Sequence, residues 1–342
     1  MKIMHLAAAA GCAAFLAACE EGPDFSQEDV SGPPATPRVS ARVIENYDGL
    51  SGRVLDLALM PSATPYFSRA FVAVDTGGFD VIDFAEGGVT HIDAPEVGAL
   101  ATAPDFQLRG SSAPLLIGAM GELAAPRAWV FLAEDGVLVD IPMEPIETEG
   151  VIRGVCADRA TPALLDLLVI TDPAIERWRI SDQGGDLLSA VRVDTIPAGR
   201  AFDLCASHDG AIVGVSGGGA RIVGGGGWGF SDGSDVASVT RADGAWAIVT
   251  RPSERGATLV GPLDEEVDLS FDAALNTTGM TAPQLVTASA ANFGGPFSDG
   301  LAVVAESDRV YVVELGGVIA DAKAALMRPS PDAAARTSAG SP

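Results

Sequence analysis

The chain has 342 residues, of which 48% are hydrophobic and only 20% charged, so it is long and apolar enough to bury a sizeable core. Its formal net charge of -25 at pH 7 gives a surface that repels nucleic acid and anionic lipid headgroups, which excludes both as partners. The 40 glycines and 22 prolines favour many short strands and turns over long helices.

Residues 1–18 are predicted to be a lipoprotein signal peptide. Lys2 provides the basic start, and residues 6–16 form an apolar stretch too short to span a bilayer. The sequence Leu16-Ala17-Ala18-Cys19 resembles the bacterial lipobox, which implies that Cys19 becomes the lipid-carrying first residue of the mature chain. The alternative is an ordinary signal peptide that happens to contain this cysteine. Glu20 stands where an inner-membrane retention signal has Asp, so we expect the periplasmic face of the outer membrane.

The rest of the chain divides into three predicted parts. Residues 19–40 are acidic and then Pro-rich, as is typical of a tether that lifts a domain off the membrane. Residues 41–316 carry alternating apolar strands and form the predicted domain. Residues 317–342 are a tail with a short helix at 319–327, followed by an Ala/Pro/Ser segment that is typical of disorder.

Six hairpins of short apolar strands are predicted in the domain. From Val72 to Val303 there are 231 residues over five intervals, or about 46 each, close to the length of a propeller blade. The predicted fold is therefore an all-β, six-bladed β-propeller; the alternative is an irregular sandwich. An early strand at 42–45 can complete the last blade and close the ring, which hides the sheet edges. The paired segments are 71–75 with 80–84, 129–132 with 137–139, 167–172 with 175–180, 211–215 with 220–223, 246–249 with 257–260, and 301–304 with 310–313.

Residues 152–223 contain one unit twice, with a cysteine on the first strand of each copy. Cys156 lies in the first copy and Cys205 in the second. Equivalent positions in neighbouring blades would place the two side by side, and an exported protein folds in an oxidising compartment, so we predict a disulfide. The alternative is a pair of buried free thiols that act as small hydrophobes.

Several segments of the domain carry a family resemblance. In sequence and order they are similar to the β-propeller phytases, which are six-bladed, calcium-dependent phosphatases of inositol hexakisphosphate. The resemblance covers most of residues 50–315. The segments are Val74-Asp75-Thr76-Gly77-Gly78, Arg153-Gly154-Val155-Cys156, Ile170-Thr171-Asp172, Ile175-Glu176-Arg177-Trp178, Asp203-Leu204-Cys205-Ala206 and Pro296-Phe297-Ser298-Asp299-Gly300-Leu301.

The resemblance implies a set of site residues. In the family, clustered carboxylates hold several calcium ions, a metal-bound water attacks the phosphorus, and basic side chains bind phosphate. Carried over to this sequence, the candidate metal ligands and phosphate-binding arginines are residues close to the motifs above. The metal candidates are Asp203, Asp172, Glu176, Asp75 and Asp209, and the phosphate candidates are Arg153 and Arg177.

This sequence also departs from the family pattern. Thr76 and Pro173 stand where the family has lysines, and residues 217–219 are glycines where the family has an acidic run. The only lysines of the chain are Lys2 and Lys323, and neither lies in the predicted propeller. A multi-histidine zinc site is excluded by counting, because only His91 and His208 follow the signal peptide. His208 is interpreted as part of a solvated turn, with a catalytic base as the alternative.

Two functions are consistent with these observations. One is a 3-phytase-type, calcium-dependent hydrolysis of phosphate monoesters, with a phosphorylated small molecule as ligand. The other is a non-catalytic propeller that acts as a binding or scaffold module in the cell envelope, with a protein partner and with the lipid anchor as its contact with the membrane. Whether the remaining carboxylates converge on one end of the central channel separates the two.

Overall fold

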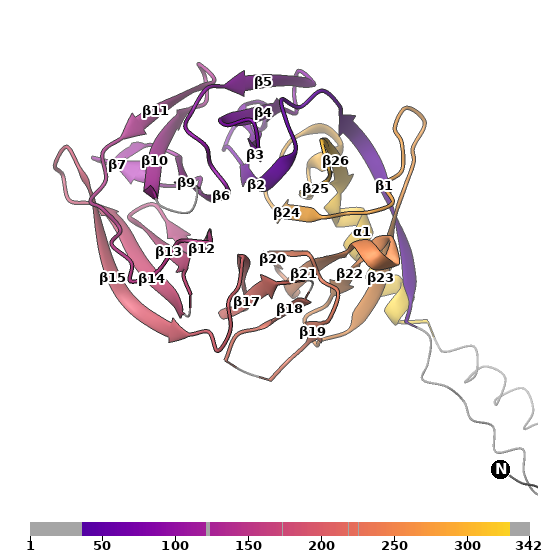
Figure 1. Ribbon diagram of the computed structural model, residues 1–342. Helices are drawn as coiled ribbons and strands as arrows, with labels where there is room; N and C mark the ends of the chain where they lie inside the picture. Colours follow the sequence, from indigo (N-terminus) through magenta and orange to yellow (C-terminus); the bar gives the residue numbers. More distant parts are fainter. Residues whose placement is uncertain (1–35, 121–123, 173, 218, 225, 329–342) are drawn as a thin grey trace, which may run out of the picture. The chain divides into compact units, whose positions relative to one another are not determined.

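The computed structural model describes residues 36–328, except 121–123, 173, 218 and 225. The predicted signal peptide, Cys19, most of the tether and the last part of the tail lie outside these residues. Within them the chain is an all-β propeller, in which sheets follow one another around a central channel (Figure 1).

The first two sheets are four-stranded, and both consist mainly of up-and-down antiparallel strands. A strand pair, β7 (Gln107–Leu108) and β8 (Ser111–Ser112), extends from the second sheet as a small ribbon. The first sheet contains β2 (Val54–Met60), β3 (Arg69–Val74), β4 (Phe79–Asp83) and β5 (Gly88–Ile92); the second contains β6 (Ala99–Ala103), β9 (Leu115–Met120), β10 (Ala124–Leu132) and β11 (Val137–Ile141).

The next two sheets are also four-stranded and antiparallel, and they correspond to the duplicated unit at residues 152–223. The third sheet contains β12 (Gly154–Thr161), β13 (Leu164–Ile170), β14 (Ala174–Asp182) and β15 (Leu188–Pro197); the fourth contains β16 (Leu204–His208), β17 (Ala211–Ser216), β18 (Gly219–Ile222) and β19 (Gly229–Phe230).

The last sheet has eight strands because β1 (Arg38–Tyr47) pairs on both of its sides. Its first half is parallel to β23, with Arg38 opposite Asp268, and its second half is antiparallel to β26, with Val43 opposite Val313. The second pairing confirms the predicted closing strand. The other strands are β20 (Asp235–Arg241), β21 (Gly244–Arg251), β22 (Gly256–Val260), β23 (Glu266–Asp272), β24 (Leu285–Ser289), β25 (Leu301–Glu306) and β26 (Arg309–Glu314).

All six predicted hairpins are present with the expected partners. The prediction of six separate blades is not reproduced, because the described chain has, besides the two-stranded ribbon of β7 and β8, four separate four-stranded sheets and one sheet of eight strands. The first strands of the sheets and the two inner strands of the large sheet contact one another in a closed cycle, β2, β6, β12, β16, β20, β24 and back to β2. These six are called the inner strands below.

The core is divided among the gaps between neighbouring sheets, since each sheet is apolar on both faces. One cluster fills the gap between the first two sheets around Phe71, Phe79 and Trp129. Another fills the gap between the third and fourth sheets around Ile170 and Phe202. Burial of apolar side chains on both faces of a twisted sheet is the main force that holds adjacent blades together.

The C-terminal helix α1 (Leu315–Leu326) begins before the predicted helix, and the predicted domain boundary at residue 316 falls inside it. Gly316 and Gly317 are poor helix formers, so the sequence pattern favoured a later start. The carboxylate of Glu314 accepts the backbone N–H of Gly317 at 2.7 Å and caps the first turn. Strand β1 likewise begins at Arg38, inside the predicted tether. Among residues 36–328, with the gaps given above, the 3-10 helices are η1 (Pro65–Phe67), η2 (Pro252–Glu254) and η3 (Gly295–Phe297).

Candidate functional site

The inner strands enclose a cavity of about 270 Å³ in the central channel. All six inner strands contribute to its wall, mostly with small side chains and backbone. Asp56 and Asp235 are its ionisable lining residues, and no Lys, Arg or His of the described chain lines it. A cavity with this lining has acidic groups and no compensating cation.

Asp56 lies near the start of β2, at a register shift between Val54 and Asp56. Its carboxyl accepts the backbone N–H of Leu57 at 2.8 Å and the N–H of Leu100, on the next inner strand, at 2.6 Å. Burial raises the pKa of Asp56 to about 7, although both N–H groups act in the opposite direction. The side chain thus ties β2 to β6 in a place where its charged form is disfavoured.

Asp235 repeats this arrangement on β20. It accepts the backbone N–H of Val236 and that of Val286, on the next inner strand, both at 2.7 Å. Burial, and secondarily the charge of Asp56, raises the pKa of Asp235 well above its ordinary value, against the effect of the two N–H groups. The two carboxyls are therefore close enough for the ionisation of one to oppose that of the other.

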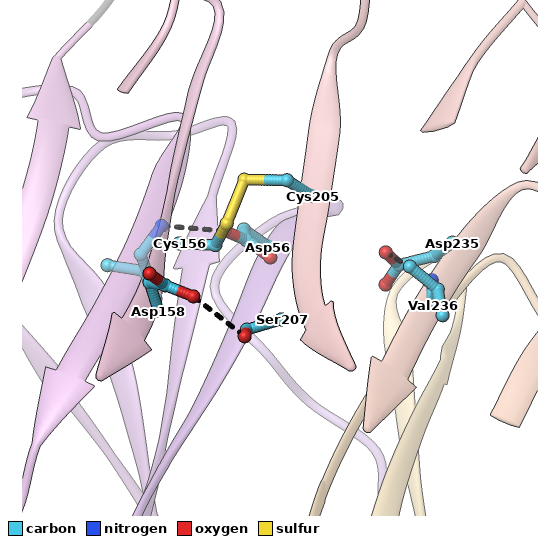
Figure 2. The surroundings of a disulfide bond; sticks show 8 residues. Asp56, Cys156, Asp158, Cys205, Ser207, Asp235 and Val236 are labelled. Atoms are coloured by element: carbon cyan, nitrogen blue, oxygen red, sulfur yellow. Dashed lines mark hydrogen bonds between the residues drawn. A yellow bond between two sulfur atoms is a disulfide. The ribbon is translucent and has the colours of Figure 1, made fainter. Parts of the chain in front are cut away.

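The disulfide ties a third pair of inner strands. Cys156 on β12 and Cys205 on β16 are joined, with their Cα atoms 5.8 Å apart, as Figure 2 shows. This confirms the predicted pairing, although Cys156 is the third residue of its strand and Cys205 the second of its own. Gly154 permits this close approach, because a Cβ there would lie 2.4 Å from the carbonyl oxygen of Asp203.

Three of the candidate residues from the sequence lie together where the inner strands begin. The guanidinium of Arg153 is 3.4 Å from the carboxylate of Asp203 and 3.8 Å from that of Asp172. All three side chains are about half exposed. The arrangement is an ion-pair triad in which the predicted phosphate contact pairs with two predicted metal ligands and offsets one of their two negative charges.

Arg177, the second phosphate candidate, is also held by carboxylates. Its Nε is 2.9 Å from Asp158 and its Nη1 is 3.4 Å from Asp194. Asp158 in turn accepts the hydroxyl of Ser207 on β16 at 2.8 Å (Figure 2). Arg177 therefore belongs to a polar link between the third and fourth sheets, separate from the Arg153 triad.

The remaining metal candidates are dispersed. Glu176 is buried and accepts the indole N–H of Trp178 at 2.9 Å, with Arg192 at 3.7 Å. Asp75 accepts the backbone N–H of Arg53 at 2.9 Å, near the start of β2. Asp209 follows the last residue of β16, at the opposite end of the channel, in a left-handed turn with φ 48°.

The donor set does not fit calcium at the predicted positions. Calcium takes six to eight oxygen ligands from several carboxylates that converge. Here Asp203 and Asp172 face a guanidinium, Glu176 faces an indole N–H, and Asp209 is at the other end of the channel. No group of three or more His, Cys, Asp or Glu side chains that could hold a metal ion occurs among residues the structure describes.

His208 does not lie in a solvated turn. It is buried at the end of β16, and its Nδ1 is 2.8 Å from the hydroxyl of Ser238 on β20. Burial lowers the pKa of His208, which favours the neutral ring. The interpretation as a solvated turn was wrong, because β16 continues through this residue and packs its ring against Trp228.

The sequence interpretation missed Asp56 and Asp235. The one signal is at Asp56, a single acidic residue in the otherwise apolar segment Val54-Leu55-Asp56-Leu57-Ala58; Asp235 follows a polar run and carries no such signal. An isolated carboxyl in a buried strand indicates a fixed hydrogen-bond partner, but not which one.

Comparison with known proteins gives the fold and nothing finer. No family model matches the chain, and no curated protein matches it. The crystal structure of BBS1N in complex with ARL6DN, soaked with lead, is 11% identical, with a TM-score of 0.52 over 81% of this chain and 98% of that one. The β-propeller domain of Myceliophteria thermophila Cps50 (Swd1) is 7% identical, with a TM-score of 0.48 over 80% of this chain and 100% of that one. A protein of unknown function from Bacteroides thetaiotaomicron VPI-5482 is 11% identical, with a TM-score of 0.46 over 82% of this chain and 75% of that one.

Among the described residues, no helix has both the length and the hydropathy needed to cross a bilayer.

Proposed function

We propose that this chain is a non-catalytic propeller that binds a partner in the cell envelope, anchored by a lipid on Cys19. The observation that carries the proposal is the use of the candidate carboxylates: Asp203 and Asp172 pair with Arg153, and Glu176 is buried against Trp178. These carboxylates face separate partners and do not converge on one point, whereas calcium takes six to eight oxygen ligands from groups that converge.

We infer that the ring has six blades. The eight-stranded sheet divides into two groups of four, β20 to β23 and β24 to β26 with β1, and each group supplies one inner strand to the cycle. The parallel contact of β1 with β23 joins the groups edge to edge. Counted in this way, each blade has four strands, as the sequence spacing predicts.

The envelope location is supported by the disulfide. A stable structural disulfide is typical of exported proteins and uncommon in the cytosol. The Cys156–Cys205 bond is thus consistent with the lipobox-like Leu16-Ala17-Ala18-Cys19. Mass spectrometry of the membrane-extracted chain tests the anchor, since a diacylglyceryl adduct on Cys19 is expected and an unmodified Cys19 would contradict it.

A second candidate function, phosphate monoester hydrolysis, is favoured by one observation. Arg153, Asp172 and Asp203 lie in loops next to different strands and come together at the end where the inner strands begin, as the phytase resemblance implies. If calcium displaced Arg153 from this triad, the two carboxylates would face the metal and the arginine would be free for phosphate.

One experiment separates the two functions. Phosphate release from phytate is measured with millimolar calcium and with chelator, and thermal unfolding is followed under the same conditions. We expect no calcium-dependent release and no calcium-dependent change in Tm. Calcium-dependent release that Asp203→Asn abolishes, while the matched variant Asp209→Asn retains it, would establish the hydrolase and overturn the binding proposal.

A further inference from the structure

Two arginines beside the start of β16 share one aromatic ring. The Cζ of Arg200 lies 5.3 Å from the centroid of Phe202, and the Cζ of Arg221 lies 5.7 Å from it. Phe202 is fully buried, whereas both arginines are exposed. The two guanidinium groups therefore cover a ring that belongs to the core between the third and fourth sheets.

Glycines create the space for this arrangement. A Cβ on Gly214 would lie 2.5 Å from the Phe202 ring, so the ring rests directly on the backbone of β17. Arg221 on β18 is opposite Gly214, and the Nη2 of Arg200 lies 3.6 Å from the point where Gly219 would carry a Cβ. Stacking on an aromatic face fixes the plane of a guanidinium and leaves the N–H groups along its edge free to bind a ligand.

Neither guanidinium has a protein acceptor in the described chain. Eleven of the eighteen described arginines have a carboxylate oxygen within 4.0 Å. Arg200 and Arg221 have none, although the chain carries 46 acidic residues. The carboxylate nearest to Arg200 in sequence is that of Asp203, which forms an ion pair with Arg153 at 3.4 Å.

We propose that Arg200 and Arg221 form a binding site for a single carboxylate or phosphate group of a small molecule. Their Cζ atoms are at most about 11 Å apart, because both lie close to the same centroid. A ligand group that binds both arginines would lie between the two guanidinium groups. Each guanidinium offers the paired N–H donors that bind a carboxylate or phosphate through two oxygens.

The charge of the whole chain selects among anions. At -25 the protein repels a polyanion over long range, while a small anion with one such group meets the local positive charge of two arginines. The ligand class is therefore a small mono-anion or di-anion, and not a nucleic acid or a highly phosphorylated compound. This inference names a ligand for the proposed binding role, and its failure leaves the outcome of the calcium and phytate experiment unaffected.

The test is isothermal titration of the purified protein with inorganic phosphate and, separately, with acetate, at an ionic strength held constant with sodium chloride. We expect 1:1 binding of at least one of the two anions. The anion that binds shows whether the site takes a phosphate or a carboxylate group. Arg200→Gln/Arg221→Gln should weaken binding at least tenfold. The matched control is Arg159→Gln, which removes an exposed arginine of β12 that has no ion pair in the described chain and should leave the Kd unchanged.

A charge-conserving variant keeps the proposal testable if the double glutamine variant unfolds. Arg200→Lys/Arg221→Lys retains both charges but loses the paired N–H geometry, so binding should again be at least tenfold weaker. If neither phosphate nor acetate binds, the proposal is overturned. Equal weakening by Arg159→Gln, or undiminished binding by the lysine variant, would also overturn it, since attraction would then depend on charge alone.

Discussion

Two kinds of junction between neighbouring inner strands differ chemically, in addition to the hydrogen bond between His208 and Ser238 that joins β16 to β20. At two junctions, β2 with β6 and β20 with β24, a buried aspartic acid accepts a backbone N–H of the next strand. We call these the carboxyl junctions. At the disulfide junction, β12 with β16, a covalent bond is accompanied by exposed ion pairs. The contrast shows that one ring can combine junctions whose stability depends on the protonation of a carboxyl with a junction whose stability depends on the oxidation of two cysteines.

The largest expected effect comes from breaking the disulfide junction. Cys156→Ser/Cys205→Ser opens a covalent loop with a sequence separation of 49 residues. By the loop-entropy model this lowers the free energy of unfolding by about 4 kcal/mol. Urea denaturation of the double variant and the parent measures the difference. A loss below about 1 kcal/mol would mean that the non-covalent contacts between β12 and β16 are sufficient.

The carboxyl junctions should instead respond to pH. The pKa of Asp56 is about 7 in the folded state against an ordinary value of 3.8, so folding favours its neutral form. The resulting stabilisation is fully present below about pH 4 and is lost as the pH rises through 7. In Asp56→Asn the group no longer titrates.

The stability of the parent relative to Asp56→Asn should therefore fall by about 4 kcal/mol between pH 4 and pH 8. Denaturation curves of both proteins across this range give the difference, which cancels the contribution of the carboxylates that do not interact with Asp56 and leaves that of Asp56 together with its effect on Asp235. Asp203→Asn, which removes an exposed carboxyl near the start of β16, is the matched control. If the difference in stability between the parent and Asp56→Asn does not change with pH, the raised pKa of Asp56 is contradicted.

Truncation of the second carboxyl should have a smaller effect. Asp235→Ala leaves the N–H groups of Val236 and Val286 without their acceptor. We expect a loss of about 2 kcal/mol, because each unsatisfied buried donor costs about 1–3 kcal/mol and the adjacent cavity admits water. Thermal unfolding at pH 5 measures it, with Asp203→Ala as the control. Equal losses in the two variants would show that burial of Asp235 contributes nothing specific.

Much of the fold could be predicted because it depends on local patterns. The hairpins follow from alternating apolar residues and turn signals, and the closing strand from the need to cover a sheet edge. The cysteines could be paired because the repeat that contains them is visible in the sequence. The count of separate sheets could not be predicted, since β1 reaches across to β23 in a parallel contact that leaves no local signal.

The candidate site was much less predictable. The resemblance drew attention to Asp203, Asp172 and Arg153, and these do lie together. The ion pairs that they form depend on side-chain directions that sequence spacing does not encode. Asp56 and Asp235 were missed because their partners are backbone N–H groups of the next inner strand. Every residue has such a group, so the pairing is specified by the register of the ring and not by residue identity.

The smallest expected effect sharpens the comparison at the exposed part of the disulfide junction. Arg153→Gln removes the guanidinium that lies between Asp203 and Asp172, while the covalent bond of Cys156 remains. All three charged side chains are roughly half exposed, so water and salt screen the pairs, and we expect a loss of about 0.5 kcal/mol that vanishes in 1 M salt. Urea denaturation at low and high salt measures it. A loss above about 2 kcal/mol, or one independent of salt, would mean that the triad stabilises the junction as strongly as a buried interaction does. The covalent bond could then no longer be treated as the main stabilising interaction between β12 and β16.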